Sequence, residues 1–378
     1  MPWKEESVVS QRLRLIEQML LPGADVSNLA RTFGVSRKTA YKWLNEYNKG
    51  GLAALKDKNR SPITQPNRSS KRVEKVVIAA HKDFPYWGPY KLMQYIVNEK
   101  RLKKTPSHTT IGNILKRNGC EVINNNKSHP ATRRFEREQP NDLWQMDFKG
   151  SFMTKEHRCF PLTIIDDFSR FSVGLKACLN ERRDTVKSQL ISIFKEFGTP
   201  CQINVDNGNP WGSTDLESLT SLHVWLIKQG IKLTHSAPYH PQTNGKNERF
   251  HRSLKLEVLH QRKYKNNREM QKAFNEWRHI YNFKRPHQGI ENKTPGSRYK
   301  ASYRKFQENL SDYDYANCEV VKKVSKLNGF FSFKGKRYRA GKALNNEYIA
   351  IKETDRSDQF AIYFMDSFIK KFDLKESV

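Results

Sequence analysis

The chain has 378 residues, of which 68 are Lys or Arg and 39 are Asp or Glu, giving a net charge of +29. This length allows roughly two to four domains, and the 37% hydrophobic content supports packed cores. There is no run of roughly 20 apolar residues that could cross a bilayer, and the N-terminus MPWKEESVV has no signal-peptide core, so we expect a soluble cytoplasmic protein.

Five widely spaced cysteines without a CxxC pair favour reduced thiols over a disulfide framework or a structural zinc site. The positive charge fits a polyanion partner, although charge alone fits a ribosomal or membrane-surface protein equally well. Basic residues are dense in 31–75, 127–137 and 246–265, and each of these stretches adjoins a segment whose sequence pattern indicates nucleic-acid binding. The distribution therefore favours DNA or RNA as the partner.

Residues 1–50 have the pattern of a helix-turn-helix domain. Apolar spacing predicts helices over 10–21, 26–33 and 37–47, with Gly34 in the turn and Ser36 as the cap of the third helix. The third helix would be the recognition helix, whose N-terminal half contacts base edges and phosphates. The candidate DNA-binding residues are Arg37, Lys38, Thr39, Tyr41 and Lys42. The alternative is a small helical bundle with a solvated basic face.

A basic, Gly- and Pro-containing linker is expected over residues 51–69, followed by a second helical unit over 70–126. Its helices are predicted at 70–82, 88–98 and 107–117, the last capped by Ser107. This unit is either a second helix-turn-helix-like DNA-binding domain or a connector that packs on the next domain. A second basic linker covers 127–137.

Residues 138–300 alternate between strand and helix patterns. Strands are expected around Asp147 and at 158–166, 171–178, 202–206 and 231–235; helices are expected at 182–197, 215–229, 241–262 and 266–285. This order predicts an α/β domain with a mixed sheet flanked by helices. Two strands and one helix would each contribute a carboxylate to one site: Asp147, Asp206 and Glu248.

Three carboxylates in one site repel one another, by about 4 kcal/mol per pair at 4 Å and an effective dielectric constant of 20. Hard divalent cations relieve this cost, because magnesium prefers carboxylate oxygens and takes its remaining ligands from water and phosphate. A phosphodiester is therefore the expected substrate. Two such ions would activate the attacking oxygen and stabilise the leaving oxygen of an in-line displacement.

The segments WQMDF, TIIDDFSR, VDNG and HPQTNGKNER strongly resemble, in this order, the DDE transposases of bacterial insertion sequences and the related retroviral integrases. YNFKRPHQGIENKTP resembles the closing motif of the same family, with Ile290 in place of the usual Leu. The resemblance covers residues 135–300. It implies a ribonuclease-H-like catalytic core in which Asp147, Asp206 and Glu248 bind two divalent cations, Mg²⁺ or Mn²⁺. The 41 residues between the last two acids exceed the family's common spacing, which fits an insertion around 211–225.

The resemblance also implies contacts with DNA. Tyr239, Asn244 and Lys255 match positions that contact the DNA end, although integrases often have Gln where Asn244 stands. Lys246, Arg249 and Arg252 are expected to contact phosphate, with a solvated helix face as the alternative reading. A homo-oligomer assembled on two DNA ends is expected as well, together with a bacterial, nucleoid-associated location.

Adjacent Asp166 and Asp167 are an apparent fourth acidic pair. On a strand, neighbouring side chains point to opposite faces. We therefore expect a structural role, with a turn beginning at DDFSR and Asp167 paired to Arg170.

A connector is predicted at 301–320, and short alternating runs from 321 to 378 predict a small β-barrel. The expected fold class is thus multidomain: N-terminal all-α helix-turn-helix units, an α/β ribonuclease-H-like core and a C-terminal small β-barrel. The leading functional hypothesis is a DNA transposase that binds terminal inverted repeats, cleaves phosphodiester bonds at the element ends and joins them to target DNA. The alternatives are a catalytically silent DNA-binding regulator, a retroviral-type integrase and a nuclease without strand transfer.

Overall fold

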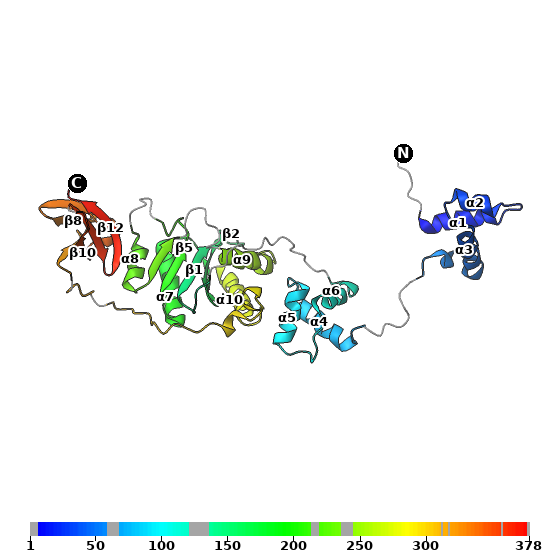
Figure 1. Ribbon diagram of the computed structural model, residues 1–378, viewed down its shortest axis with the longest axis horizontal. Helices are drawn as coiled ribbons and strands as arrows, with labels where there is room; N and C mark the ends of the chain where they lie inside the picture. The colour runs from blue at the N-terminus through cyan, green and yellow to red at the C-terminus, as the bar shows by residue number, and fades with distance from the viewer. Residues whose placement is uncertain are drawn as a thin grey trace. The chain divides into compact units, whose positions relative to one another are not determined.

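The computed structural model describes residues 7–58, 68–120, 136–212, 219–235, 245–310, 313–316, 318–356 and 358–375 (Figure 1). The chain forms two compact units, Met1–Arg68 and Ser69–Val378. Among the described residues no helix is long and apolar enough to span a membrane.

The first unit contains the three predicted N-terminal helices. They are α1 (Val8–Met19), α2 (Val26–Thr32) and α3 (Arg37–Gly50), followed by a 3₁₀ turn at Gly51–Leu55. The side chains of Ser7, Asp25 and Ser36 cap the three helices by accepting backbone N–H groups of their first turns. Apolar residues from all three helices form a small core: Leu15, Met19, Ala30, Ala40 and the partly buried Leu44.

A second set of three helices begins the second unit. These are α4 (Lys71–Asp83), α5 (Pro89–Asn98) and α6 (His108–Arg117), with Ser107 capping α6 as predicted. Stacked Phe84 and Trp87 pack edge-on to Tyr95 at the centre of their core. Ile280, from the following α/β domain, packs against this core too.

The α/β domain is built on a six-stranded mixed sheet. Its strands are β1 (Leu143–Phe148), β2 (Phe152–Met153), β3 (Arg158–Asp166), β4 (Ser172–Cys178), β5 (Gln202–Val205) and β6 (Lys232–His235). The order is β2-β3-β1-β5-β6, and β4 also pairs with β3 but lies outside this order. β1 pairs antiparallel with β3 and parallel with β5, so the predicted mixed sheet is confirmed.

Helices cover both faces of this sheet (Figure 1). On one face, Trp144 and Met146 of β1 share a core with α7 (Arg183–Phe197) and α8 (Ser221–Lys228). On the other face, Ile165 and Leu175 share a core with α9 (Gly245–Leu254), a π-helical turn (Lys255–Leu259) and α10 (Asn267–Phe283). Alternate residues of β1 therefore face different helices, which decides where its one acidic side chain points.

The segment that follows α10 stays attached to the α/β domain. It carries 3₁₀ turns at Gln288–Ile290 and Pro295–Ser297. Beyond them, the Ser302 N–H donates to the Phe197 carbonyl at 2.8 Å and the Thr199 N–H donates to the Arg304 carbonyl at 2.7 Å. The first residues of the predicted connector thus pack on the C-terminal end of α7.

The C-terminal part consists of antiparallel strands. β7 (Val320–Lys323), β10 (Tyr348–Glu353), β11 (Gln359–Phe364) and β12 (Ser367–Asp373) form a sheet in the order β12-β11-β10-β7. β8 (Phe330–Phe333) and β9 (Lys336–Arg339) form a separate hairpin, with a 3₁₀ turn at Lys342–Leu344. The strand prediction is confirmed, but the structure shows no closed barrel in its described residues, because the hairpin does not share hydrogen bonds with the four-stranded sheet. Val224 and Ile227 of α8 join the core of this part, whose strands lie beside α8 in Figure 1.

Candidate active site

Two of the predicted acids lie close to the ends of neighbouring parallel strands, Asp147 within β1 and Asp206 directly after β5. Gln145 of β1 is paired with Asn204 of β5. Two residues further along both strands come Asp147 and Asp206. Since Trp144 and Met146 point into the α7 side of the sheet, Asp147 points to the α9 side.

The charges of these two side chains interact. Burial and then the charge of Asp206 raise the pKa of Asp147 to about 7. The side chain of Asp147 is 24% exposed, so its oxygens remain accessible. Asp206 sits in the turn after β5, where its Oδ1 accepts the Gly208 N–H at 3.0 Å and its carbonyl contacts His235 Nδ1 at 2.9 Å.

The third predicted acid, Glu248, lies in the first turn of α9 and is exposed. Among the described residues no group of three His, Cys, Asp or Glu side chains is close enough to hold a metal ion. The structure therefore brings Asp147 and Asp206 together, while the grouping of Glu248 with them stays a prediction. Tyr239 and Asn244, predicted to contact DNA, lie outside the described residues.

Helix α9 reaches Asp147 through a residue that the sequence analysis did not single out. His251 Nδ1 is 3.9 Å from Asp147 Oδ2, and its Nε2 is 2.8 Å from the Thr163 hydroxyl. His251 follows Glu248 by three positions, so the two lie on the same side of the helix. The three-residue spacing from Glu248 was the sequence feature that could have pointed to His251. It indicates a role near Asp147 only when α9 is known to pack on β1 and β3.

The acidic pair at the end of β3 has a structural role, as expected. Asp166 is fully buried and accepts the N–H groups of Asn141 at 2.7 Å and Ser169 at 2.8 Å, which holds the turn. The predicted partner of Asp167 was wrong. Lys246 of α9 forms an ion pair with Asp167, whereas Arg170 pairs with Glu136 at 2.8 Å. The error has a physical cause: α9 approaches the sheet from a distant part of the chain and delivers a cation that local spacing does not reveal.

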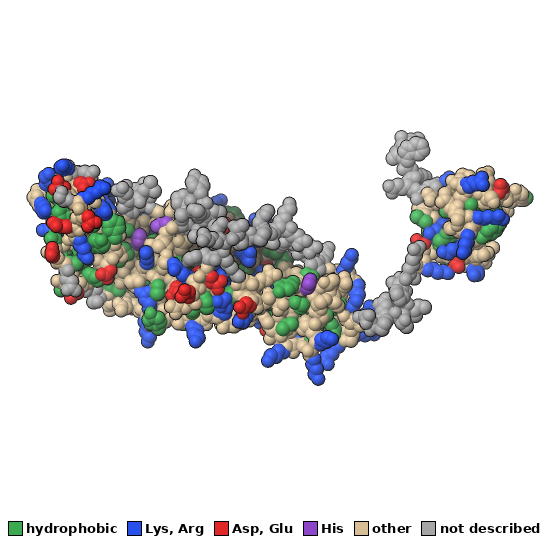
Figure 2. All heavy atoms as spheres, in the orientation of Figure 1, with side chains coloured by type: hydrophobic (Ala, Val, Ile, Leu, Met, Phe, Trp, Pro, Cys, Tyr) green, Lys and Arg blue, Asp and Glu red, His purple; other side chains and the backbone are tan. Residues whose placement is uncertain are grey.

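The other predicted DNA contacts lie mainly on exposed surface. Arg249, Arg252 and Lys255 are exposed on α9 and the turn that follows it, whereas Lys246 is held at Asp167 and burial lowers its pKa to about 8. In the first unit, Arg37, Lys38, Tyr41 and Lys42 are exposed on α3, and the Thr39 hydroxyl is 2.8 Å from that of the capping Ser36. Lys and Arg side chains are spread over the visible faces of both helical units (Figure 2).

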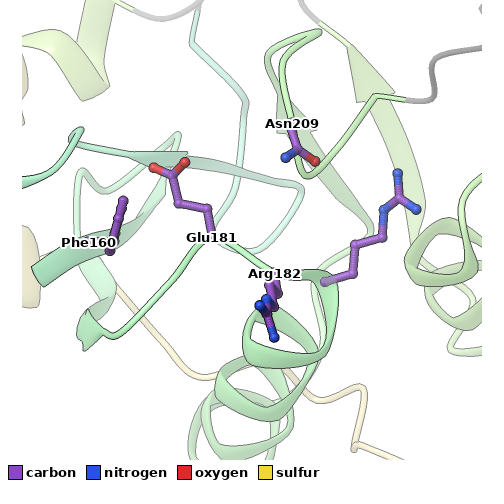
Figure 3. Close-up of a pocket in the computed structure, with 5 residues that line it drawn as sticks. Phe160, Glu181, Arg182 and Asn209 are labelled. Atoms are coloured by element: carbon purple, nitrogen blue, oxygen red, sulfur yellow. The ribbon is translucent and has the colours of Figure 1, made fainter. Parts of the chain in front are cut away.

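An open cavity of about 470 Å³ lies at the start of α7 (Figure 3). It is lined by Phe160, Glu181, Arg182, Arg183 and Asn209. Burial and the charge of Asp206 raise the pKa of Glu181, so this carboxyl group lies within electrostatic reach of the paired acids. The sequence analysis missed Glu181, because it stands in a charged run at a helix start, where acids are common.

The donor set suits a hard divalent cation. Asp147 and Asp206 offer carboxylate oxygens at the solvent-accessible end of two strands, and their mutual repulsion would be relieved by a bound cation. The two aspartates would hold the ion, and water and a phosphate oxygen would complete its coordination.

Comparison with known proteins agrees with this geometry. The sequence matches the Integrase core domain family over residues 137–241, and a second family described as Integrase core domain over 229–295. It matches a Helix-turn-helix domain over 11–63, a Homeodomain-like domain over 39–115 and the "IS481 family transposase, C-terminal domain" over 319–378.

Three relatives illustrate the similarity. The "Insertion element IS476 uncharacterized 39.2 kDa protein" of Xanthomonas euvesicatoria is 28% identical over 45% of this chain and 47% of its own length. The IS407 uncharacterized 31.7 kDa protein of Burkholderia multivorans is 24% identical over 52% of this chain and 70% of its own. The "Putative integrase ORF3" of Spiroplasma virus SpV1-C74 is 26% identical over 54% of this chain and 61% of its own. The match thus spans about half the length of the first of these relatives.

The sheet order and the matched segments show that the α/β domain is similar to integrase cores. With its helix-turn-helix region and its C-terminal segment, the chain is similar to insertion-sequence transposases, and the C-terminal segment matches that of the IS481 family.

Proposed function

We propose that this chain is a DNA transposase that binds the terminal inverted repeats of its element, hydrolyses a phosphodiester bond at each end and joins the exposed 3′-hydroxyl to target DNA. The observation that carries the proposal is the interaction of Asp147 with Asp206 near the carboxyl ends of two neighbouring strands of a sheet that resembles integrase cores. Two carboxylates in this position suit phosphoryl transfer, because the reaction needs positioned cations and no protein nucleophile.

The catalytic step follows from the donor set. Asp147, Asp206 and Glu248 would hold two divalent cations, Mg²⁺ or Mn²⁺, which when bound activate the attacking oxygen and stabilise the leaving one. Binding requires both aspartates to be ionised. Burial and the charge of Asp206 raise the pKa of Asp147, so a bound cation would favour its ionised form.

Recognition of DNA is assigned to separate parts of the chain. The exposed residues of α3 (Arg37, Lys38, Tyr41 and Lys42, with Thr39) would read the element end. Near the catalytic acids, Arg249, Arg252 and Lys255 would contact phosphates, together with Tyr239, Asn244 and Lys246. Residues 70–126 would add a second DNA-binding module, and a homo-oligomer would hold two ends for coupled joining. We propose a bacterial, nucleoid-associated location.

The test incubates the purified full chain with a labelled fragment carrying an end of its own element, a target plasmid and Mg²⁺. Wild-type protein is expected to produce joined molecules, and Asp147→Asn, Asp206→Asn and Glu248→Gln are each expected to abolish them while end binding is retained. Glu276→Gln changes an exposed carboxylate on α10 and serves as the matched control. Tight end binding by the wild type without cleavage or joining would refute the proposal and favour a catalytically silent regulator.

A further inference from the structure

The feature of interest is the way in which α9 is held against the strand that carries Asp147. Phe250 and Leu254 are fully buried in a core that they share with α10, the neighbouring turn and Ile165 and Leu175 of the sheet. An apolar contact of this kind fixes a helix against its neighbours, yet it tolerates small sliding motions. The polar contact of His251 with Thr163 of β3 is directional, so it also fixes the rotation of the helix against the sheet.

The hydrogen bonds of the Thr163 hydroxyl show which atom is the donor in its contact with His251. Thr163 stands opposite Asp147 in the antiparallel register of β1 and β3, and its hydroxyl donates to the Asp147 carbonyl at 2.9 Å. A hydroxyl has one hydrogen to donate. His251 Nε2, 2.8 Å from the same oxygen, must therefore be the donor. The bond is buried, since Thr163 is 0% and His251 8% exposed.

The same ring faces the carboxylate with its other nitrogen. The distance of 3.9 Å between His251 Nδ1 and Asp147 Oδ2 is too long for a hydrogen bond. Burial lowers the pKa of His251 to about 3, so the ring is neutral and its Nδ1 has no hydrogen. A neutral ring fills the space beside Asp147 without neutralising its charge.

We propose that His251 is a positioning residue, which uses its Nε2–H bond to Thr163 to lock α9 onto β1 and β3 and so sets the placement of Glu248 relative to Asp147. Residues 248 and 251 are neighbours across one helical turn, with Cβ atoms roughly 5–6 Å apart. Any rotation or slide of α9 that broke the Thr163 bond would move Glu248 by a comparable amount. The inference rests on the proposed function, since Glu248 matters only if it completes the site.

The experiment compares two pairs of variants in the full chain. His251→Leu removes the donor and His251→Gln keeps an N–H donor at the end of the side chain, while Thr163→Val removes the hydroxyl and Thr163→Ser keeps it. We expect His251→Leu and Thr163→Val each to lower the yield of joined DNA by about 10²-fold, because a misplacement near 1 Å costs this much. His251→Gln and Thr163→Ser should stay within about tenfold of wild type, and the double variant His251→Leu/Thr163→Val should lose no more than either single one.

Amide hydrogen exchange over residues 245–254 supplies a readout that does not depend on activity. Exchange should accelerate in His251→Leu and Thr163→Val and remain near the wild-type rate in Thr163→Ser. His279→Leu, at an exposed position on α10, is the control for loss of a histidine. Retained end binding shows that the first unit and the fold are intact.

The outcomes separate the two ideas. The positioning role would be overturned if His251→Leu changed neither the yield of joined DNA nor the amide exchange of α9. It would also be overturned if His251→Leu and His251→Gln lowered the yield of joined DNA equally and neither accelerated the exchange. If wild-type protein joins no DNA, the proposed function fails, while the exchange comparison still decides whether His251 locks α9.

Discussion

Lys246 and Asp167 provide the sharpest test of how α9 is anchored. The ion pair connects the first turn of α9 to the end of β3, with the Asp167 side chain 0% and the Lys246 side chain 17% exposed. We consider Lys246→Met, which keeps the length of the apolar stem and removes the charge.

The expected cost follows from what Asp167 retains. Its carboxylate keeps the Gln145 Nε2–H bond at 2.8 Å and the Arg137 N–H bond at 2.9 Å. Removing one partner of a buried pair costs about 3–5 kcal/mol, and with two donors left we expect the lower end, about 3 kcal/mol. For a domain of this size, that corresponds to a fall in Tm of roughly 6–12 °C.

Adding Asp167→Asn to Lys246→Met removes the uncompensated charge and should recover a large part of the loss. Burial lowers the pKa of Lys246 to about 8, which indicates that desolvation outweighs the attraction of Asp167, so the pair contributes placement more than stability. Thermal unfolding of the single and double variants measures both effects. A Tm of Lys246→Met equal to that of wild type, or a further fall in the double variant, would refute this account.

The same variant separates anchoring from DNA contact. If Lys246 meets a phosphate, as the sequence pattern predicts, Lys246→Met lowers the slope of log affinity against log salt by about 1. An unchanged slope together with a lowered Tm assigns the residue to anchoring alone.

Three further predictions concern the fold around the site. Gly198→Ala is expected to lower the unfolding free energy by more than about 2 kcal/mol, because φ is +76° and the new Cβ would lie 2.7 Å from the carbonyl oxygens of Ser302 and Arg304. Gly335→Ala is the control, because φ is +74° there too but the space around it is open. It should cost only the strain of the left-handed backbone, about 1–2 kcal/mol. Burial lowers the pKa of His223 to about 4 in the folded protein. As the pH drops below 6.5, His223 therefore becomes protonated in the unfolded chain before it does in the folded one, and stability falls. Urea unfolding should show a contribution of about 2 kcal/mol lost between pH 6.5 and 5 that is absent in His223→Gln, and parallel pH profiles would contradict it. Chelation of divalent cations is expected to abolish joining and leave end binding intact, as measured by gel shift with and without chelator.

Much of the backbone could be predicted from the sequence, because local chemistry decides it. Serine and aspartate caps begin α1, α2, α3 and α6 close to where the pattern of apolar residues places them. The adjacency of Asp147 and Asp206 was also predictable, since Asp147 lies within one predicted strand and Asp206 directly follows the apolar residues of another. Period-2 alternation then fixes the face on which Asp147 lies.

The contacts between distant elements could not be predicted in this way. The pairing of Lys246 with Asp167 joins residues 79 positions apart, and that of His251 with Thr163 joins residues 88 apart. Each depends on the rotation of α9 about its own axis, which the hydrophobic pattern leaves open by tens of degrees. The described residues do not show the expected barrel closed, for a related reason: alternation identifies strands, but closure depends on which edges share hydrogen bonds.

The last feature of the site concerns the lysine and arginine side chains near Asp147, which could compete with a metal ion. In a chain of net charge +29, a lysine or arginine would readily occupy an accessible acidic site and compete with a metal ion. Yet within the described parts of the chain, the ion pairs place only the neutral His251 at Asp147, and Lys246, two residues before Glu248, is held by Asp167. The attraction of Lys149 acts on Asp147 less strongly than burial and the repulsion from Asp206, so the pKa stays raised. Among the described residues no lysine or arginine forms an ion pair with Asp147, so its repulsion from Asp206 would be left for a divalent ion to relieve.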